Sequence, residues 1–203
     1  MKRKLIVFLT SLFFLFTACT VQTDSPVSVS DPVVLARASI PISDRDSYHL
    51  RLEMVAGRYY QGKTAIDRYD TNWEGSFQLV VCLNQPDSEL SRCDIQIDGP
   101  TMLFPGEFDL QWADYNRDGN PDLSIGQYGA SNWNIYRLYT ILPGGEIEEL
   151  PVDGGWVMAS LQKFSAAFEP LEEGGFLVPW YNMEQGEMTA IHYQWNGSQF
   201  VKA

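Results

Sequence analysis

The sequence has few of the residue types on which most catalytic and nucleic-acid-binding sites depend. Its 203 residues include 2 histidines, 3 cysteines and only 14 lysine plus arginine residues, against 26 aspartate plus glutamate residues. The net charge of −12 leaves little basic surface for a phosphate backbone, so the composition disfavours nucleic acid as a partner. Charge-driven binding to anionic lipid is disfavoured for the same reason.

Recognised catalytic motifs are also missing. The two histidines, His49 and His192, lie far apart in the sequence, and neither belongs to an H-E-x-x-H or C-x-x-C motif. The sequence contains no G-x-S-x-G nucleophile elbow and no glycine-rich phosphate loop. Adjacent acids such as Glu148 and Glu149 are expected on the solvated surface of so acidic a chain. We therefore expect a protein that is not an enzyme, with a hydrolase as the alternative.

The only long hydrophobic run is at the N-terminus. Residues 2–4 are basic, Leu5–Phe16 is a largely apolar stretch of 12 residues, and Thr17-Ala18-Cys19 follows. A membrane-spanning helix needs about 20 apolar residues, so this run is typical of a secretory signal peptide. The sequence before Cys19 resembles the lipobox of bacterial lipoproteins, which implies that residues 1–18 are removed and that Cys19 carries lipid. Cleavage of an ordinary signal peptide nearby is the alternative.

The residues after Cys19 predict a linker between an anchor and a domain. The segment from Thr20 to Val34 is rich in Ser, Thr, Asp and Pro and shows no hydrophobic period. We therefore divide the chain into a signal peptide (1–18), a lipidated cysteine with a flexible tether (19–40) and a folded domain (41–203). This organisation predicts a lipid-anchored protein of the cell membrane or outer membrane, facing the extracytoplasmic side, with the membrane as its first partner.

Two cysteines remain in an exported chain, where disulfides are stable. Cys82 ends an apolar run and Cys93 opens an alternating one, and the residues between them include the turn formers Pro86, Asp87 and Ser88. Two antiparallel strands joined by this loop would bring the thiols close together. We expect a Cys82–Cys93 disulfide, with two free thiols as the alternative.

Hydrophobic alternation and frequent turn residues predict an all-β fold. The sequence has 16 glycines and 11 prolines, which suit turns between short strands better than long helices. An antiparallel sandwich, a barrel or a partial propeller-like sheet would fit, with at most one short helix, over Trp156–Phe168. The hairpin signal Asn196–Gly197 precedes the last expected strand. The strands are expected near residues 48–54, 77–83, 93–97, 108–112, 123–125, 133–142, 176–181, 188–195 and 199–201.

One segment has the spacing of a calcium-binding loop. Residues 114–122 read Asp-Tyr-Asn-Arg-Asp-Gly-Asn-Pro-Asp, with oxygen-bearing side chains at loop positions 1, 3, 5 and 9 and a glycine at position 6. Calcium takes six to eight oxygen ligands, and a glycine permits the sharp turn that brings alternate side chains together. The predicted ligands are Asp114, Asn116, Asp118, the carbonyl of Asn120, and Asp122. Capping of a polar turn by the same side chains is the alternative.

The flanks of this loop differ from those of an EF-hand. Position 12 is Ile125 instead of glutamate, and both flanks have the pattern of strands. The segment Ala113–Gly126 resembles the calcium loop of FG-GAP and VCBS-type repeats, D-x-N-x-D-G-x-x-D-L between two strands. Those repeats form the blades of integrin-like β-propellers, which need several blades. This sequence contains one copy, so the resemblance implies a calcium site and leaves a full propeller unsupported.

The region around the loop resembles a group of bacterial lipoproteins and periplasmic proteins. In that group a single calcium loop precedes a Gly/Asn segment and an aromatic strand, as in residues 129–136, and the chain ends in a strand pair like Tyr193–Phe200. Some members resemble periplasmic lysozyme inhibitors. The resemblance implies a protein that inhibits, or gives immunity against, a cell-wall hydrolase.

Tryptophan and asparagine next to the loop suggest where a partner would bind. Trp133 lies between Asn132 and Asn134, and an exposed aromatic ring flanked by amides can stack on a sugar or anchor a protein. Core packing is the alternative for this residue. We therefore expect a calcium-stabilised, lipid-anchored binding protein that holds a protein or glycan at the cell envelope. A structural subunit of an envelope assembly and an envelope-acting hydrolase are the other functions considered.

Overall fold

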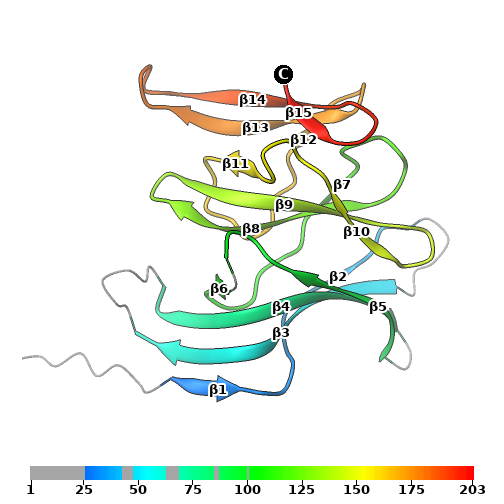
Figure 1. The fold of residues 1–203 in the computed structure, drawn as a ribbon, viewed down its shortest axis with the longest axis vertical. Coiled ribbons are helices and arrows are strands. Elements are labelled where there is room, and N and C mark those ends of the chain that lie inside the picture. Colours follow the sequence, from blue (N-terminus) through cyan, green and yellow to red (C-terminus); the bar gives the residue numbers. More distant parts are fainter. Residues whose placement is uncertain (1–25, 43–47, 63–68, 85–86, 100) are drawn as a thin grey trace, which may run out of the picture.

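A computed structural model describes residues 26–42, 48–62, 69–84, 87–99 and 101–203 (Figure 1). In these ranges the regular secondary structure consists of antiparallel strands in three sheets, none of which closes into a barrel. The all-β prediction is therefore confirmed. The predicted signal peptide and Cys19 lie outside the described residues.

Sheet A is the largest and lies at one end of the molecule (Figure 1). Its order is β1-β3-β4-β5, with β2 also paired to β3 and β6 paired to β4. The long central pair extends from Tyr48 opposite Leu83 to Gln61 opposite Thr71, with a shift in register between Met54 and Ala56. The strands are β1 (Val27–Val29), β2 (Val33–Ser39), β3 (Tyr48–Gln61), β4 (Thr71–Asn84), β5 (Asp87–Ile95) and β6 (Met102–Phe104).

Sheets B and C complete a stack of three layers, with sheet B in the middle (Figure 1). In sheet B the order is β10-β9-β8-β7, with β11 also paired to β9, and in sheet C it is β12-β13-β14-β15. Sheet B consists of β7 (Trp112–Ala113), β8 (Asp122–Ala130), β9 (Trp133–Ile141), β10 (Ile147–Leu150) and β11 (Val157–Ala159). Sheet C consists of β12 (Glu169–Pro170), β13 (Gly175–Asn182), β14 (Glu187–Trp195) and β15 (Phe200–Lys202).

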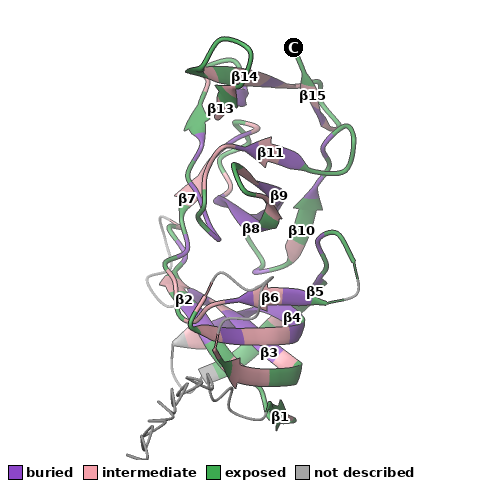
Figure 2. Ribbon diagram, turned by 90° about the vertical axis from the view of Figure 1, so that its left-hand side faces the viewer, coloured by how far each residue is buried: buried purple, intermediate pink, exposed green. Residues whose placement is uncertain are grey.

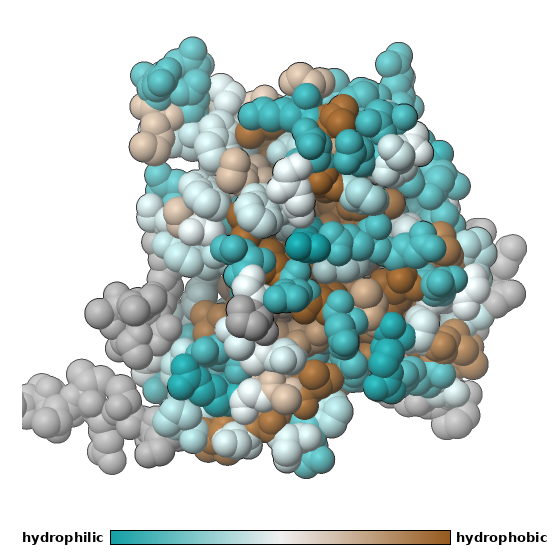
Figure 3. Space-filling model, in the orientation of Figure 1, coloured by the Kyte–Doolittle hydropathy of each residue, from teal (hydrophilic) through white to brown (hydrophobic). Residues whose placement is uncertain are grey.

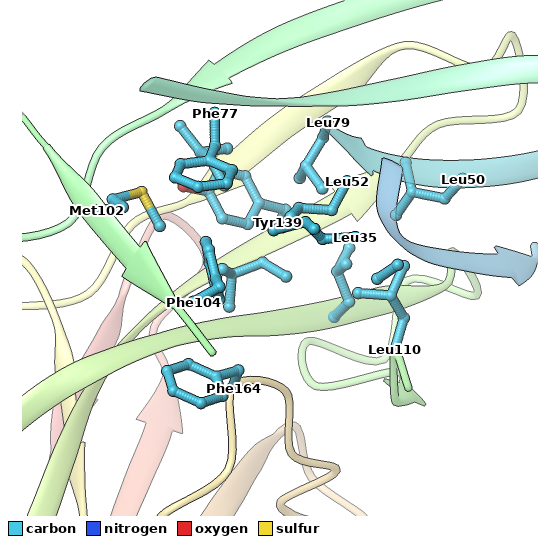
Figure 4. Close-up of a cluster of buried hydrophobic side chains, with 14 of the residues drawn as sticks. Leu35, Leu50, Leu52, Phe77, Leu79, Met102, Phe104, Leu110, Tyr139 and Phe164 are labelled. Atoms are coloured by element: carbon cyan, nitrogen blue, oxygen red, sulfur yellow. The ribbon is translucent and has the colours of Figure 1, made fainter. Parts of the chain in front are cut away.

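Alternating side chains of the middle sheet build two cores. On β9, Tyr139 faces sheet A and belongs to the first core. The preceding residue, Leu138, faces sheet C and belongs to the second core. The first core contains Leu50, Leu52, Phe77, Leu79 and Phe104 from sheet A (Figure 4). The second contains Phe176, Val178, Tyr193 and Phe200 from sheet C. Buried residues accordingly form bands between the layers (Figure 2).

The segment predicted as a possible helix is extended. Within Trp156–Phe168, β11 places Val157 and Ala159 in the second core, and Phe164 then reaches the first core. The segment therefore contributes side chains to both cores. Its apolar residues resemble a partial helical period because they are buried against two different sheets, not because they form one face of a helix.

The predicted tether contains two strands. β1 and β2 fall within residues 19–40 and pair with successive parts of β3, and Leu35 and Ala36 are buried. The prediction of a flexible segment up to residue 40 is therefore wrong from Val27 onward. Free hydrogen-bonding groups along the edge of β3 stabilise these strands, although their own sequence has little hydrophobic period.

The predicted disulfide is absent, and both cysteines are free thiols. Cys93 pairs with Leu79 on β4, whereas Cys82 pairs with Glu89, so the two thiols are offset by three residues along the sheet. That offset corresponds to about 10 Å, and it also places the two side chains on opposite faces of sheet A. A disulfide requires Cα atoms closer than about 7 Å, so the prediction is wrong for this register.

Candidate metal centre

The predicted calcium loop connects the hairpin strands β7 and β8 in the middle layer. Ala113 pairs with Asp122 across the base of the hairpin, so the loop of residues 114–121 has fixed ends. Asp122 also lies directly opposite Thr140 on β9. Its side chain is on the face of sheet B that is directed toward sheet C, because its neighbour Leu123 faces the first core.

Side-chain oxygens of the loop accept hydrogen bonds from the loop's own backbone. Oδ2 of Asp114 accepts from the amide of Gly119 at 3.2 Å, and Oδ1 of Asp118 accepts from the amide of Asn120 at 2.8 Å. Oδ1 of Asn116 accepts from the amide of Asp118 at 3.2 Å. These contacts curl the chain around its oxygen-bearing side chains, and the left-handed backbone of Gly119 (φ 84°) makes the bend.

Two carboxylate oxygens in the loop have no protein partner. Oδ1 of Asp114 and Oδ1 of Asp122 are buried and accept no hydrogen bond from the described residues. Asp122 is completely buried, and its other oxygen accepts a 2.7 Å hydrogen bond from the amide of Tyr115. An unsatisfied buried acceptor costs about 1–3 kcal/mol, and more when it is charged. A cation or a water molecule would relieve this cost at each oxygen.

The charge state of Asp122 reflects this environment. Burial raises the pKa of its carboxyl from 3.8 to about 7, the nearby Thr140 hydroxyl and the amide of Tyr115 lower the pKa, and the charges of Asp118 and Asp114 raise it. The Thr140 hydroxyl is itself buried and makes no hydrogen bond of standard geometry. A cation among these three carboxylates would reverse the shift by stabilising their charged forms.

The acidic side chains of the loop do not form a complete metal site by themselves. Among the described residues, no group of three or more His, Cys, Asp and Glu side chains is gathered closely enough to hold an ion by itself. In a calcium loop, the amide oxygen of Asn116 and the carbonyl of Asn120 supplement the carboxylates. The donor set fits calcium, a hard cation that prefers oxygen ligands, better than zinc, which prefers nitrogen and sulfur.

The loop is fixed to sheet C as well as to sheet B. The carbonyl of Tyr115 accepts a 2.6 Å hydrogen bond from the amide of Gly175 at the start of β13. The Tyr115 ring is fully buried against Phe176, and its hydroxyl donates to the carbonyl of Ala166 at 3.1 Å. Arg117 Nε donates to the carbonyl of Leu171 at 2.9 Å. The loop therefore forms a junction between two layers.

Sequence reasoning missed the role of Tyr115. It occupies loop position 2, between two predicted ligands, where side chains usually point away from the ion. An aromatic residue within a strongly polar segment was the available signal, because an isolated aromatic ring usually marks burial.

The predicted partner-binding residues do not form one surface. Asn132 is exposed, and its amide contacts the sulfur of Met183 at 3.8 Å. Trp133 is half-buried and packs over Gly129 and the first core. Asn134 is buried and donates to the carbonyl of Lys163 at 3.1 Å. Only Asn132 of the three is freely available to a partner.

An open depression of about 490 Å³ lies elsewhere, along β2. It is lined by Val34–Arg37 and by Glu107–Asp109. None of the predicted calcium ligands lines it, and neither histidine does.

Because comparisons with known proteins found no match, the function is inferred from the loop and the fold. No protein-family model, curated protein or solved structure gives a significant match to this chain. In the part of the chain that the structure describes, no helix is long and apolar enough to cross a membrane.

Proposed function

We propose that this protein is a calcium-stabilised binding module held at the outside of a bacterial cell membrane or outer membrane by a lipid on Cys19. The buried carboxylate of Asp122, with one oxygen bonded to the loop and the other unpartnered, carries the calcium part of this proposal. The basic, apolar and Ala-Cys segments at the N-terminus carry the anchor.

Calcium in this proposal has a structural role. Asp114, Asn116, Asp118, the Asn120 carbonyl and Asp122 would hold the ion, and Tyr115 would transmit the resulting order to sheet C through its contact with Gly175. The ion would supply positive charge to the carboxylates of Asp114, Asp118 and Asp122. Because position 12 carries Ile125 in place of a bidentate glutamate, we expect the weak affinity of extracellular modules, with a Kd of about 10⁻⁴ to 10⁻³ M.

A binding role is favoured over catalysis by the surroundings of the loop. Its carboxylates contact backbone amides of the same loop, as in a structural turn. The loop connects two packed layers, which suits an element that fixes a scaffold. An inhibitor or immunity protein directed against a cell-wall hydrolase is one form that such a binding protein would take.

Thermal unfolding of the purified mature protein tests the calcium part. We expect millimolar calcium to raise the melting temperature relative to chelator, since an ion that binds only the folded state stabilises it by mass action. Magnesium should have a smaller effect because it requires tighter octahedral geometry. Calorimetric titration without heat at millimolar calcium would disprove the site.

Cell fractionation tests the anchor. We expect the wild-type protein in the membrane fraction, with a lipid-modified N-terminal cysteine by mass spectrometry. Cys19→Ala should release the protein or leave an unprocessed precursor. An unmodified N-terminus downstream of Cys19 in the wild-type protein would disprove lipid anchoring.

A further inference from the structure

The outer face of sheet C is an apolar surface without a covering layer among the described residues. On β13 and β14, Phe176, Val178 and Tyr193 point into the second core. The residues between them point the opposite way, because successive side chains of a strand alternate between faces. The apolar members of this outer face are Leu177, Pro179, Tyr181, Met188, Ala190 and Val201, and its polar members include His192, opposite Leu177, and Gln194, opposite Val201.

The most exposed members lie side by side. Tyr181 pairs directly with Met188 across the two strands, and their exposed fractions are 38% and 56%. Pro179 and Ala190 form the next pair. The paired parts of β13 and β14, 8 residues each at about 3.3 Å per residue in two rows about 4.8 Å apart, give a face on the order of 250 Å². Apolar residues that lie side by side in this way, unlike ones scattered singly, often mark an interaction site.

The opposite end of the stack has a different composition. The outward face of sheet A carries Arg37, Arg51 and Arg92 in one row across β2, β3 and β5, with Val80 between the last two. Next to this row, Glu53 is paired with Arg51 at 2.8 Å. The edges of the layers are mixed, with hydrophobic residues scattered among hydrophilic ones and no broad patch on the side shown (Figure 3).

Acidic residues border this apolar face. Residues 169–203, which form sheet C and its turns, contain five glutamates and one lysine. Glu169 lies beside Leu177 in the β12–β13 pair, and Glu184 lies in the turn between β13 and β14. Both of these side chains are exposed. A partner that covers the apolar centre must therefore place positive charge at the rim.

We propose that the outer face of sheet C docks a basic protein, through an apolar contact centred on Tyr181 and Met188 and an acidic rim that meets lysine and arginine side chains. A second copy of this chain is disfavoured as the occupant, because it would bring the same glutamates against one another. An area near 250 Å² is about a third of what each partner buries in a standard interface, about 800 Å², so the rim must contribute. This inference rests on the proposed binding function and is independent of the calcium site.

Site-specific photo-cross-linking in the producing cell tests the proposal with the full chain. A benzoylphenylalanine replaces Met188 in one variant, Asn132 in a second, and Val27 in a third. Val27 is the matched control, since it is an exposed hydrophobic residue (61%) on sheet A. We expect a discrete adduct from the Met188 position, none from Val27, and a basic protein when mass spectrometry identifies it.

Binding of that identified protein to the purified chain gives the second measurement. Tyr181→Ser with Met188→Ser should weaken binding at least about tenfold, and Glu169→Lys with Glu184→Lys should weaken it while reducing its sensitivity to salt. Val27→Ser should leave the Kd unchanged.

The outcomes separate this inference from the binding function itself. A discrete adduct from Asn132 alone, a second copy of the chain, or an acidic protein would overturn docking of a basic protein on sheet C and leave a binding role intact. If none of the three positions gives a discrete adduct, the proposed binding function fails together with this inference.

Discussion

The backbone amide of Tyr115 donates a 2.7 Å hydrogen bond to Oδ2 of Asp122, which joins the second and ninth residues of the loop. The two residues have different functions in the loop. Asp122 keeps one buried oxygen without a protein partner, whereas Tyr115 binds sheet C through its carbonyl and its ring. Order imposed at Asp122 should therefore reach sheet C through Tyr115.

Asp122→Asn should separate ion binding from folding. Asparagine retains an oxygen that can accept from the Tyr115 amide, but it removes a buried negative charge. We expect the variant to melt at a temperature equal to or above that of the wild type in chelator at pH 8, and to lose the calcium-induced rise. The measurement is thermal unfolding followed by circular dichroism. A calcium response of wild-type size in the variant would contradict the assignment of Asp122 as a ligand.

Calcium-free protein should become more stable on mild acidification. The pKa of Asp122 is about 7 in the folded state and 3.8 unperturbed, with burial as the main cause. Protonation thus favours the folded state, and this contribution is lost as the pH rises through about 7. From pH 5.5 to pH 8 the loss is about 2 kcal/mol.

The wild-type melting temperature in chelator should fall by several degrees over this interval, and Asp122→Asn is the control that should lack this component. Saturating calcium should reverse the trend, since protons compete with the ion for Asp122. A wild-type protein in chelator with the same pH profile as Asp122→Asn would contradict the role of this carboxyl.

The sequence predicts features that depend on neighbouring residues better than features that depend on residues far apart in the chain. Alternation is a local signal, and the strands expected near residues 48–54 and 188–195 lie within β3 and β14. The turn signal Asn196–Gly197 also lies between β14 and β15, as expected. The stacking of three sheets is not local, because it depends on which face of each strand meets which neighbour.

The register between β4 and β5 is a feature that the sequence does not predict. A shift between Val81 and Cys82 leaves Leu90 as an extra residue on β5, and it helps to set which residue lies opposite each cysteine. Nothing in the residues from Cys82 to Cys93 predicts that shift, so proximity in the sequence suggested a disulfide that the register prevents.

The calcium loop was the strongest local pattern, and its predicted ligands lie in one loop between two strands, as its flanks indicated. Its attachment to Gly175 was beyond sequence reasoning, since the two segments are far apart in the chain. The same limit applies to Asn134, whose burial depends on the distant carbonyl of Lys163.

The two thiols should react at different rates. Cys82 is completely buried, whereas Cys93 is half-exposed, and burial raises the pKa of its thiol. We expect a maleimide to label Cys93 slowly in the folded protein and Cys82 only after unfolding. Reductant should leave the melting temperature unchanged. Protection of both thiols in unfolded, unreduced protein would show that a disulfide forms after all.

Gly175→Ala should destabilise the junction between the loop and sheet C. Gly175 has a left-handed φ of 123°, and a Cβ there would lie 2.2 Å from the carbonyl oxygen of Tyr193. Strain and displacement together should cost about 3 kcal/mol, or about 10 °C in melting temperature. Gly144→Ala is the control, since a Cβ at that turn meets nothing within 4 Å. Equal stability of the two variants would contradict this packing.

Calcium should protect backbone amides in two separate segments from hydrogen exchange. The amides of Gly119 and Asn120 donate to Asp114 and Asp118 in the loop, so fixing those carboxylates should slow their exchange several-fold. The amide of Gly175 donates to the carbonyl of Tyr115, and it should gain protection through that single contact although it is no ligand. Amides in the long β3–β4 pair, which packs on the other side of sheet B, should exchange at unchanged rates.

Asp118→Ala provides the matched control for this experiment. It removes one predicted ligand whose side chain is exposed, so the domain should still fold, but calcium should protect neither segment. Exchange measured by mass spectrometry with peptide resolution distinguishes the arrangements. Protection confined to the loop would mean that the ion stiffens one hairpin only. Protection that extends to Gly175 would mean that the ion holds sheet C, with its apolar outer face, in place on the middle layer.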